Sequence, residues 1–148
     1  MIDSNFYDVL AADALLYERC KELRAEGRLK FITTHIQQDQ IRATPDASKR
    51  EALNRIEASL VHTSAFAWDV SRFDLSEWTS DQDTVLIEEI IGDGNKTDIT
   101  DALIAITAKY KTDAIVTNDK SLRKRLAKVN MPVKVLSADD FIAWVKTQ

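Results

Sequence analysis

The chain has 148 residues, of which 45% are hydrophobic and 30% charged, and this indicates one soluble globular domain spanning residues 1–148. Its net charge of −4 gives no general attraction to nucleic acid or anionic lipid, so a polyanionic substrate would require local basic patches or bound cations. The single cysteine excludes a disulfide framework, and neither a membrane span nor a signal peptide is visible, so a cytoplasmic location without membrane association is expected.

The N-terminal part of the chain is expected to form a helix, a strand and a second helix after a very short apolar start. Met1-Ile2 is followed at once by Asp3-Ser4-Asn5, and residues 6–26 carry apolar side chains at helical spacing. Gly27 is well placed to end this helix in the left-handed conformation. The next predicted elements are a strand over 30–34 and a short helix over 35–42, which carries Asp39.

The middle of the chain is predicted to hold two helices separated by an aromatic-rich stretch. Thr44-Pro45 is typical of a helix start, and the buried stripe of this helix extends to Leu60. Residues 62–79 are irregular, and their aromatic side chains are expected to pack in the core or at an interface. A helix over 80–92 follows. Residues 92–95 are expected to form a turn, since they lack the Lys-Ser/Thr of a phosphate-binding P-loop.

The central helix and the strand after it carry the acids that matter most. Asp98 and Asp101 lie one turn apart in a helix that is apolar on most of its faces, so both can point the same way. Residues 114–117 form a continuous apolar run, typical of a parallel strand covered on both faces. Asn118-Asp119 would follow the carboxyl end of this strand, where open α/β sheets place their sites.

Each of these acids also has a purely structural interpretation. Asp98 can cap the central helix, because a short side-chain oxygen accepts the unpaired backbone N–H groups there. Asp101 can stabilise the same helix through its dipole. Asn118-Asp119 can cap the next helix, which begins at Ser121. Only convergence with acids from other parts of the chain favours a shared site.

The rest of the chain completes an alternating pattern. The helix after Asp119 has a basic face, a strand is predicted over 133–136, and Ser137 with Asp140 is expected to cap a last helix. Strands and helices therefore alternate across most of the sequence. This pattern predicts an α/β fold with a mainly parallel central sheet of four or five strands and helices on both faces.

Four acids are expected to meet at one edge of this sheet. Asp3, Asp39, Asp101 and Asp119 each lie near the end of a strand or the start of a helix, and these turns share one edge in a doubly wound sheet. Four carboxylates in one place repel one another and raise several pKa values unless a cation is bound. Mg²⁺ or Mn²⁺ prefers such oxygen ligands and supports hydrolysis of phosphodiesters.

Taken in order, these motifs resemble those of PIN-domain ribonucleases, most closely the small VapC-type toxins of bacterial toxin–antitoxin pairs. Asp3-Ser4-Asn5 resembles the opening Asp-x-Asn of the family, residues 101–105 its central Asp-Ala-Leu-Ile-Ala, and Thr117-Asn118-Asp119 its late Thr-Asn-Asp. The closing strand over 133–136 and the helix after it are also similar. The resemblance covers nearly the whole chain and implies a PIN-like domain.

The resemblance implies roles for particular residues. Asp3, Asp101 and Asp119 would hold or organise Mg²⁺ or Mn²⁺, with Asp98 as an additional acid. Asp39 is the candidate for the fourth catalytic acid, although the family usually has Glu there. Asn5, Thr117 and Asn118 would orient the carboxylates by hydrogen bonds. The candidates for RNA phosphate contacts are Lys120, Arg123 and Lys124, whose alternative role is a solvated helix face.

The expected function is therefore a metal-dependent endoribonuclease, with RNA as substrate, an antitoxin protein as partner and a homodimer as the assembly. Two alternatives remain open. In the first, the chain is a PIN-like module that binds RNA or protein without cleavage. The short first strand and Asp39 in place of Glu favour this alternative. Otherwise it is a metal-dependent nuclease that acts on DNA or a flap structure outside any toxin system.

Overall fold

The computed structural model describes residues 1–92 and 96–148, which form eight α-helices and four short β-strands. The helices are α1 (Ser4–Ala12), α2 (Ala14–Ala25), α3 (His35–Arg42), α4 (Ala47–Asn54), α5 (Asp81–Ile91), α6 (Lys96–Lys111), α7 (Lys120–Lys128) and α8 (Ala138–Thr147). The strands are β1 (Ile32–Thr33), β2 (Ser59–Leu60), β3 (Ala114–Val116) and β4 (Lys134–Leu136). The turn predicted over 92–95 lies, apart from Gly92, outside the described residues.

The strands form two separate parallel pairs instead of the predicted central sheet of four or five strands. Within the described residues β1 pairs with β2, and β3 pairs with β4. The mixed α/β class and the parallel direction are confirmed, but most of the structure is helical. The strands are only two or three residues long, and this limits the backbone ladder that each can offer a neighbour.

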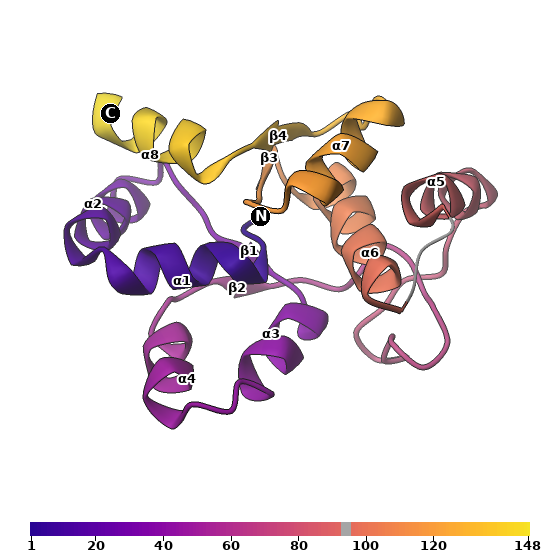
Figure 1. The fold of residues 1–148 in the computed structure, drawn as a ribbon, viewed down its shortest axis with the longest axis horizontal. Helices are drawn as coiled ribbons and strands as arrows, with labels where there is room; N and C mark the ends of the chain where they lie inside the picture. The colour runs from indigo at the N-terminus through magenta and orange to yellow at the C-terminus, as the bar shows by residue number, and fades with distance from the viewer. Residues whose placement is uncertain (93–95) are drawn as a thin grey trace.

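The N-terminal segment lies between the two strand pairs (Figure 1). Asp3 donates its backbone N–H to the carbonyl of Val116, and Val116 donates its own to the carbonyl of Met1, both at 2.9 Å. Toward β1, the described contact is made by a side chain, because the Gln37 amide donates to the carbonyl of Ile2. The extended segments therefore lie side by side, but no continuous ladder joins all of them.

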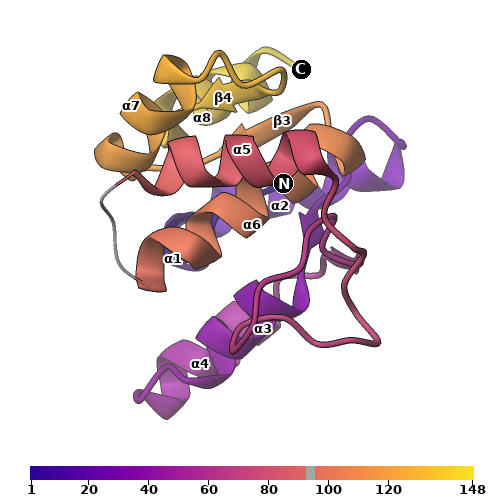
Figure 2. The same cartoon turned by 90° about the vertical axis from the view of Figure 1, so that its right-hand side faces the viewer.

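The hydrophobic core consists of two clusters. The first surrounds α6, whose Leu103, Ile104 and Ile106 are at most 1% exposed, as its all-round apolar sequence predicted. Figure 2 shows α5 lying along α6. The second cluster lies among α1, α2 and α8 and includes Phe6 and Phe141, whose rings meet edge to face at 5.2 Å. No helix of the described residues combines the length and the apolar character that a membrane crossing requires.

The helical region predicted over residues 6–26 consists of two helices. They are separated at Asp13, whose backbone is extended and whose side chain accepts a hydrogen bond from the N–H of Leu16 at 2.9 Å. An N-cap of this kind starts a new helix inside a continuous apolar period. Gly27 follows α2 with a φ of 72°, so the predicted left-handed glycine is confirmed.

The start and end of α4 also differ from the prediction. The helix begins at Ala47, after the Thr44-Pro45 signal, because Asp46 is its N-cap and accepts from the N–H of Lys49 at 2.9 Å. Its last helical residue is Asn54. Leu60, predicted in the buried stripe of this helix, lies in β2 and is 44% exposed.

The aromatic-rich stretch forms a loop over residues 61–80, which lies beside α3 in Figure 2. Its aromatic rings gather around Phe66, with centroid distances of 5.3 Å to both Trp68 and Trp78. These two tryptophans are 73% and 76% exposed, so the rings pack mainly on one another. Of the two predicted locations, the core is wrong for both tryptophans, and an interface stays a prediction.

Candidate active site

Asp3 is the acid most tightly held by its surroundings. It is buried at the N-cap of α1, where one carboxylate oxygen accepts from the N–H of Ser4 at 2.7 Å. The other oxygen accepts from the Thr117 hydroxyl at 2.8 Å and from the Asn5 amide at 3.5 Å. Burial is the main reason why the pKa of Asp3 is raised; these hydrogen bonds oppose the shift, and the charge of Asp119 adds to it.

The segment after β3 brings a second acid to the same place. The Thr117 hydroxyl, which donates to Asp3, also accepts from the backbone N–H of Asp119 at 3.1 Å. The Asp119 carboxylate caps α7 by accepting from two backbone N–H groups at 2.7 and 3.0 Å. Asn118 points elsewhere, because its side-chain oxygen accepts from the N–H of Ala138 at the start of α8. The capping interpretation of Asp119 is thus confirmed, and it leaves one carboxylate oxygen outside the cap.

The third contribution comes from the first turns of α6. Asp98 and Asp101 both pair with Arg125, which reaches across from α7 and contacts the Asp101 carboxylate at 3.1 Å. The Asp101 side chain is 15% exposed and that of Arg125 is 20% exposed, so the ion pair is largely shielded from water. The two acids predicted to point the same way therefore do so, toward a cation that the protein itself supplies.

The electrostatics of Asp101 show that the other three acids of the cluster all act on this carboxylate. Burial is the largest cause that raises the pKa of Asp101 from 3.8 to about 6. The charge of Asp3 is the next cause, Asp119 and Asp98 act in the same direction, and Arg125 opposes them. Arg125 thus pairs with two of these carboxylates, and the charge of Asp119 acts on it as well.

The donor chemistry of this cluster fits a divalent cation. Carboxylate oxygens are the ligands that Mg²⁺ and Mn²⁺ prefer, and the charges that raise the pKa of Asp101 are those a cation would offset. In the side-chain positions described, however, no group of three or more His, Cys, Asp and Glu residues within 1–92 and 96–148 is arranged to hold a metal ion. Metal binding would require the carboxylates to draw closer and Arg125 to release Asp101.

Asp39 does not join the other acids. It lies in α3, where both carboxylate oxygens accept from Arg72 at 2.8 Å and one contacts Arg42 at 3.4 Å. Its side chain is 41% exposed, and it is absent from the charges that act on Asp101 and Asp3. The structure therefore brings together Asp3, Asp98, Asp101 and Asp119 but places Asp39 apart from them.

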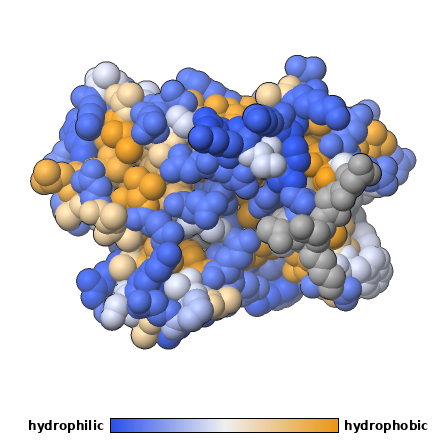
Figure 3. All heavy atoms as spheres, in the orientation of Figure 1, coloured by the Kyte–Doolittle hydropathy of each residue, from blue (hydrophilic) through white to orange (hydrophobic). Residues whose placement is uncertain are grey.

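The basic residues predicted to contact RNA lie on α7, the helix that Asp119 caps. Lys120 and Lys124 are exposed, and Arg123 is partly buried with its Nε lacking a hydrogen-bond partner among the described residues. Hydrophilic residues gather over α7 on the face shown in Figure 3. These cations are thus close in sequence to Asp119. Their exposure fits either contacts with RNA phosphates or a solvated helix face.

Two residues of this region were not predicted as site residues. The sequence places Arg125 only on the basic face of its helix. However, it lies three positions after the buried Leu122, so it is next to the side of the helix that packs against the protein. Gln37 is fully buried; its side-chain oxygen accepts from the N–H of Thr34 at 3.0 Å while its amide holds the carbonyl of Ile2. The spacing of Thr34 and Gln37 is the local signal of a capping box, which accounts for the bond to Thr34. The bond to Ile2 has no local signal, because 35 residues separate the two partners.

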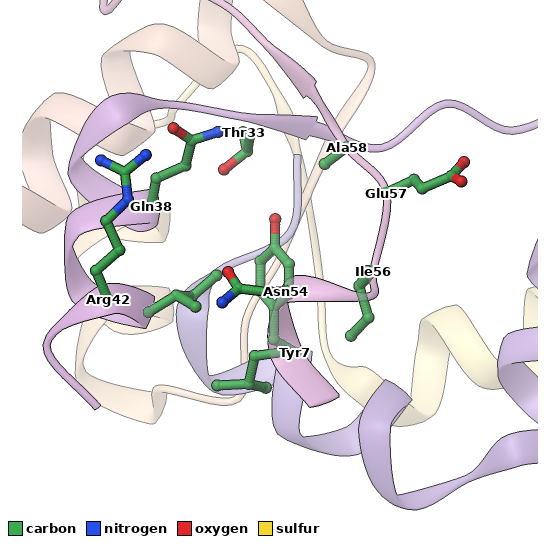
Figure 4. Close-up of a pocket in the computed structure, with 10 residues that line it drawn as sticks. Tyr7, Thr33, Gln38, Arg42, Asn54, Ile56, Glu57 and Ala58 are labelled. Carbon is green, nitrogen blue, oxygen red and sulfur yellow. The ribbon is translucent and has the colours of Figure 1, made fainter. Parts of the chain in front are cut away.

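A separate cavity of about 230 Å³ lies among α1, α3 and α4. Figure 4 shows the Tyr7 hydroxyl and the amides of Gln38 and Asn54 around it, with Arg42 at one side and Glu57 pointing away. None of the clustered acids lines this cavity. The acidic cluster and this cavity are therefore two separate features of the structure.

Comparison with known proteins gives no relative, since no family model, no curated protein and no solved structure matches the chain.

Proposed function

We propose that the chain is a metal-dependent endoribonuclease with a PIN-like fold. The observation that carries the proposal is the convergence of Asp3, Asp101 and Asp119 from three distant segments, since the charges of Asp3 and Asp119 add to burial in raising the pKa of Asp101 to about 6. Structural caps alone do not require such repulsion, because each helix could be capped by a neutral Ser or Thr. A repulsive acidic cluster is typical of a site adapted to a cation.

In this proposal the residues divide into ligands and groups that position them. Asp3, Asp101 and Asp119 would supply carboxylate oxygens to Mg²⁺ or Mn²⁺, while Thr117 and Asn5 fix the orientation of Asp3. A bound divalent cation supplies an activated water and neutralises charge on a phosphodiester undergoing hydrolysis. Backbone N–H groups at the N-termini of α1 and α7 donate to the carboxylates of Asp3 and Asp119 and so help to orient both acids.

The substrate and partners are part of the same proposal. Lys120, Arg123 and Lys124 would contact RNA phosphates and thereby overcome the net negative charge of the chain. By resemblance, the nuclease would act as a homodimeric toxin in the cytoplasm and be silenced by an antitoxin protein. In that case, expression in bacterial cells would arrest growth, and Asp101→Asn would relieve the arrest.

The direct test is cleavage of single-stranded and structured RNA with Mg²⁺ or Mn²⁺, with and without EDTA. We expect metal-dependent cleavage that falls by a factor on the order of 100 or more in Asp101→Asn and Asp119→Asn, because each change removes a charged ligand. Asp39→Asn is the matched control, since Asp39 lies outside the cluster, and it should retain most of the activity. Cleavage that persists in both cluster variants would exclude this site.

One observation favours the second candidate, a module that binds RNA or protein without cleavage. Arg125 already neutralises Asp98 and Asp101 in part, as a structural ion pair would. The two candidates differ in their response to metal. The nuclease predicts that millimolar Mg²⁺ or Mn²⁺ raises the Tm of the protein, and raises it further in Arg125→Met, where no internal cation competes. If neither protein responds to metal and RNA is bound but not cut, the binding module is the correct function.

A further inference from the structure

Four aromatic side chains of the loop over residues 61–80 form one apolar surface, which lies at the edge of the molecule in Figure 2. This aromatic surface consists of Phe66, Trp68, Phe73 and Trp78. The centroid of the Phe66 ring is 4.9 Å from that of Phe73 and 5.3 Å from that of each tryptophan, so the rings are contiguous. Phe73 is 68% exposed, and the two tryptophans are more exposed still. Large aromatic side chains that cluster in water in this way are typical of a binding surface.

Hydrogen bonds fix the loop that carries these rings. The N–H of Thr63 donates to the carbonyl of Leu75 at 2.9 Å, and the N–H of Glu77 donates to the carbonyl of Thr63 at 2.7 Å. The N–H of Phe66 donates to the hydroxyl of Thr79 at 2.8 Å. The aromatic surface is therefore held by hydrogen-bonded backbone, so a partner can bind it with little additional ordering of the loop.

The residues beside the rings carry negative charge that the protein does not neutralise. Asp69, Asp74 and Glu77 are exposed, and each is adjacent in sequence to an exposed ring. Glu77 forms an ion pair, but the side chains of Asp69 and Asp74 have no ion-pair or hydrogen-bond partner within residues 1–92 and 96–148. Arg72, the one Lys or Arg of the loop, donates to both carboxylate oxygens of Asp39 at 2.8 Å. The aromatic surface is therefore bordered by two free carboxylates.

These charges discriminate among the molecules that aromatic rings can bind. A single-stranded nucleic acid would stack its bases on the rings, but its phosphates would be repelled by Asp69 and Asp74. A second copy of the chain, related by a two-fold axis, would bring the same acids against one another. A cationic partner, in contrast, is attracted both by the carboxylates and by the faces of the rings. The charge therefore favours a basic protein segment over RNA and over self-association.

We propose that the aromatic surface binds a segment of a partner protein that carries arginine and apolar residues. The planar guanidinium group of an arginine stacks on an exposed indole ring of Trp68 or Trp78, while its N–H groups donate to a carboxylate beside the ring. The apolar side chains of the segment cover Phe73 and remove its ring from water.

The test is an NMR titration of the full-length wild-type protein, whose three indole N–H signals come from Trp68, Trp78 and Trp144. The probe is the acetylated and amidated peptide Arg-Leu-Arg-Leu-Arg, and the matched peptide Lys-Leu-Lys-Leu-Lys has the same charge. We expect saturable shifts of the Trp68 and Trp78 signals with the first peptide, and binding weaker by about threefold or more with the second, because an ammonium group cannot stack on a ring as a guanidinium does. Trp144 packs against the cluster around α1, α2 and α8, so its signal should not shift.

Substitutions at exposed positions identify the groups that bind. Asp69→Asn and Asp74→Asn should each weaken binding by roughly fivefold, and asparagine accepts the φ of 66° at position 69. Asp139→Asn removes the same charge from an exposed position of α8 and should bind normally. Trp78→Ala should weaken binding by roughly tenfold or more. Leu15→Ala, at a position of α2 that is 85% exposed, is its matched control and should have no effect. Circular dichroism would show that each variant is folded.

Three results would overturn the proposal. If the Trp68 and Trp78 signals do not shift, or if both peptides bind equally, the surface does not recognise arginine. If octauridylate shifts these signals and the peptide does not, the surface binds RNA. If the protein sediments as a dimer that Trp78→Ala converts to a monomer, the surface binds a second copy of the chain. None of these experiments measures cleavage, so their outcome is separate from that of the nuclease proposal.

Discussion

Among single residues, Asp101 bears a clear electrostatic conflict. Its pKa is raised from 3.8 to about 6, chiefly by burial and then by the charge of Asp3. Between these two pH values the folded protein binds more protons at this position than the unfolded chain. The free energy of unfolding therefore decreases as the pH rises from about 4 to about 6, and the loss is complete above that range.

The substitution Asp101→Asn removes this conflict. We expect the variant to be more stable than the wild type at pH 7.5, by up to about 3 kcal/mol, and equally stable near pH 3.5, where Asp101 is protonated in both states. Urea unfolding at the two pH values measures the difference. Asp39→Asn should instead lose between 0 and about 1 kcal/mol at pH 7.5, because it breaks an exposed ion pair. A destabilised Asp101→Asn at pH 7.5 would contradict the origin given for the raised pKa.

Among the elements, α5 and α6 are joined by a buried carboxylate that contacts the last turn of α6. Asp83 is 2% exposed near the start of α5. It accepts from the Lys109 ammonium and the Tyr110 hydroxyl at 2.9 Å, and from the Ser80 hydroxyl at 2.7 Å. Burial alone would raise the pKa of Asp83, but these hydrogen bonds outweigh it, and the pKa is lowered.

Replacing Asp83 should loosen this pair of helices. We expect Asp83→Asn to lose about 2 kcal/mol of unfolding free energy at pH 7, because Lys109 then lacks its charged partner. A lowered pKa stabilises the fold above the ordinary value of 3.8, and this contribution is lost as the pH falls through the folded-state value, so the variant and the wild type should converge in acid. Thermal unfolding between pH 2 and 7 tests both statements. Lys111→Ala, which breaks the exposed pair with Glu77, should cost less than about 1 kcal/mol.

The elements also show which features the sequence can predict. Local signals gave correct ends where capping decides them: Ser80 caps α5, Ser137 and Asp140 form the capping box of α8, and Gly27 has a positive φ. The single helix predicted over residues 6–26 was wrong because two local signals compete there. The Asp13 cap starts a new helix although the apolar side chains keep helical spacing through it.

At the candidate site, too, the features that depend on local sequence could be predicted, and those that depend on contacts between distant elements could not. The segments of Asp3, Asp101 and Asp119 could be identified because each acid adjoins a recognisable strand or helix start. The position of Asp39 depends on how α3 packs against the loop that carries Arg72, and the role of Arg125 depends on how α7 crosses α6. The pairing of the strands could not be predicted either. An apolar run predicts a strand but not how many backbone hydrogen bonds the strand makes with each neighbour.

For the molecule as a whole, the two hydrophobic clusters raise the question of whether residues 1–148 unfold as one domain. Met1 belongs to the cluster around α6 and Ile2 to the cluster around α1, α2 and α8, so the N-terminal segment is shared by both. β3 is shared as well, because Ile115 and Val116 lie in different clusters. Contacts that are shared in this way favour a single cooperative transition.

Leu103→Ala tests this cooperativity. Leu103 is fully buried in the cluster around α6, and its truncation should cost about 2–5 kcal/mol. Trp144 packs against the other cluster, so its fluorescence, in a protein with Trp68→Phe and Trp78→Phe, reports on the half of the molecule that the substitution does not touch. We expect the urea midpoint at Trp144 to fall together with the midpoint measured by circular dichroism, because the loss of one cluster unfolds the other. Val85→Ala, at an exposed position, should leave both midpoints unchanged. If the Trp144 midpoint stayed at its original urea concentration while the dichroism signal fell earlier, the chain would consist of two units that unfold separately.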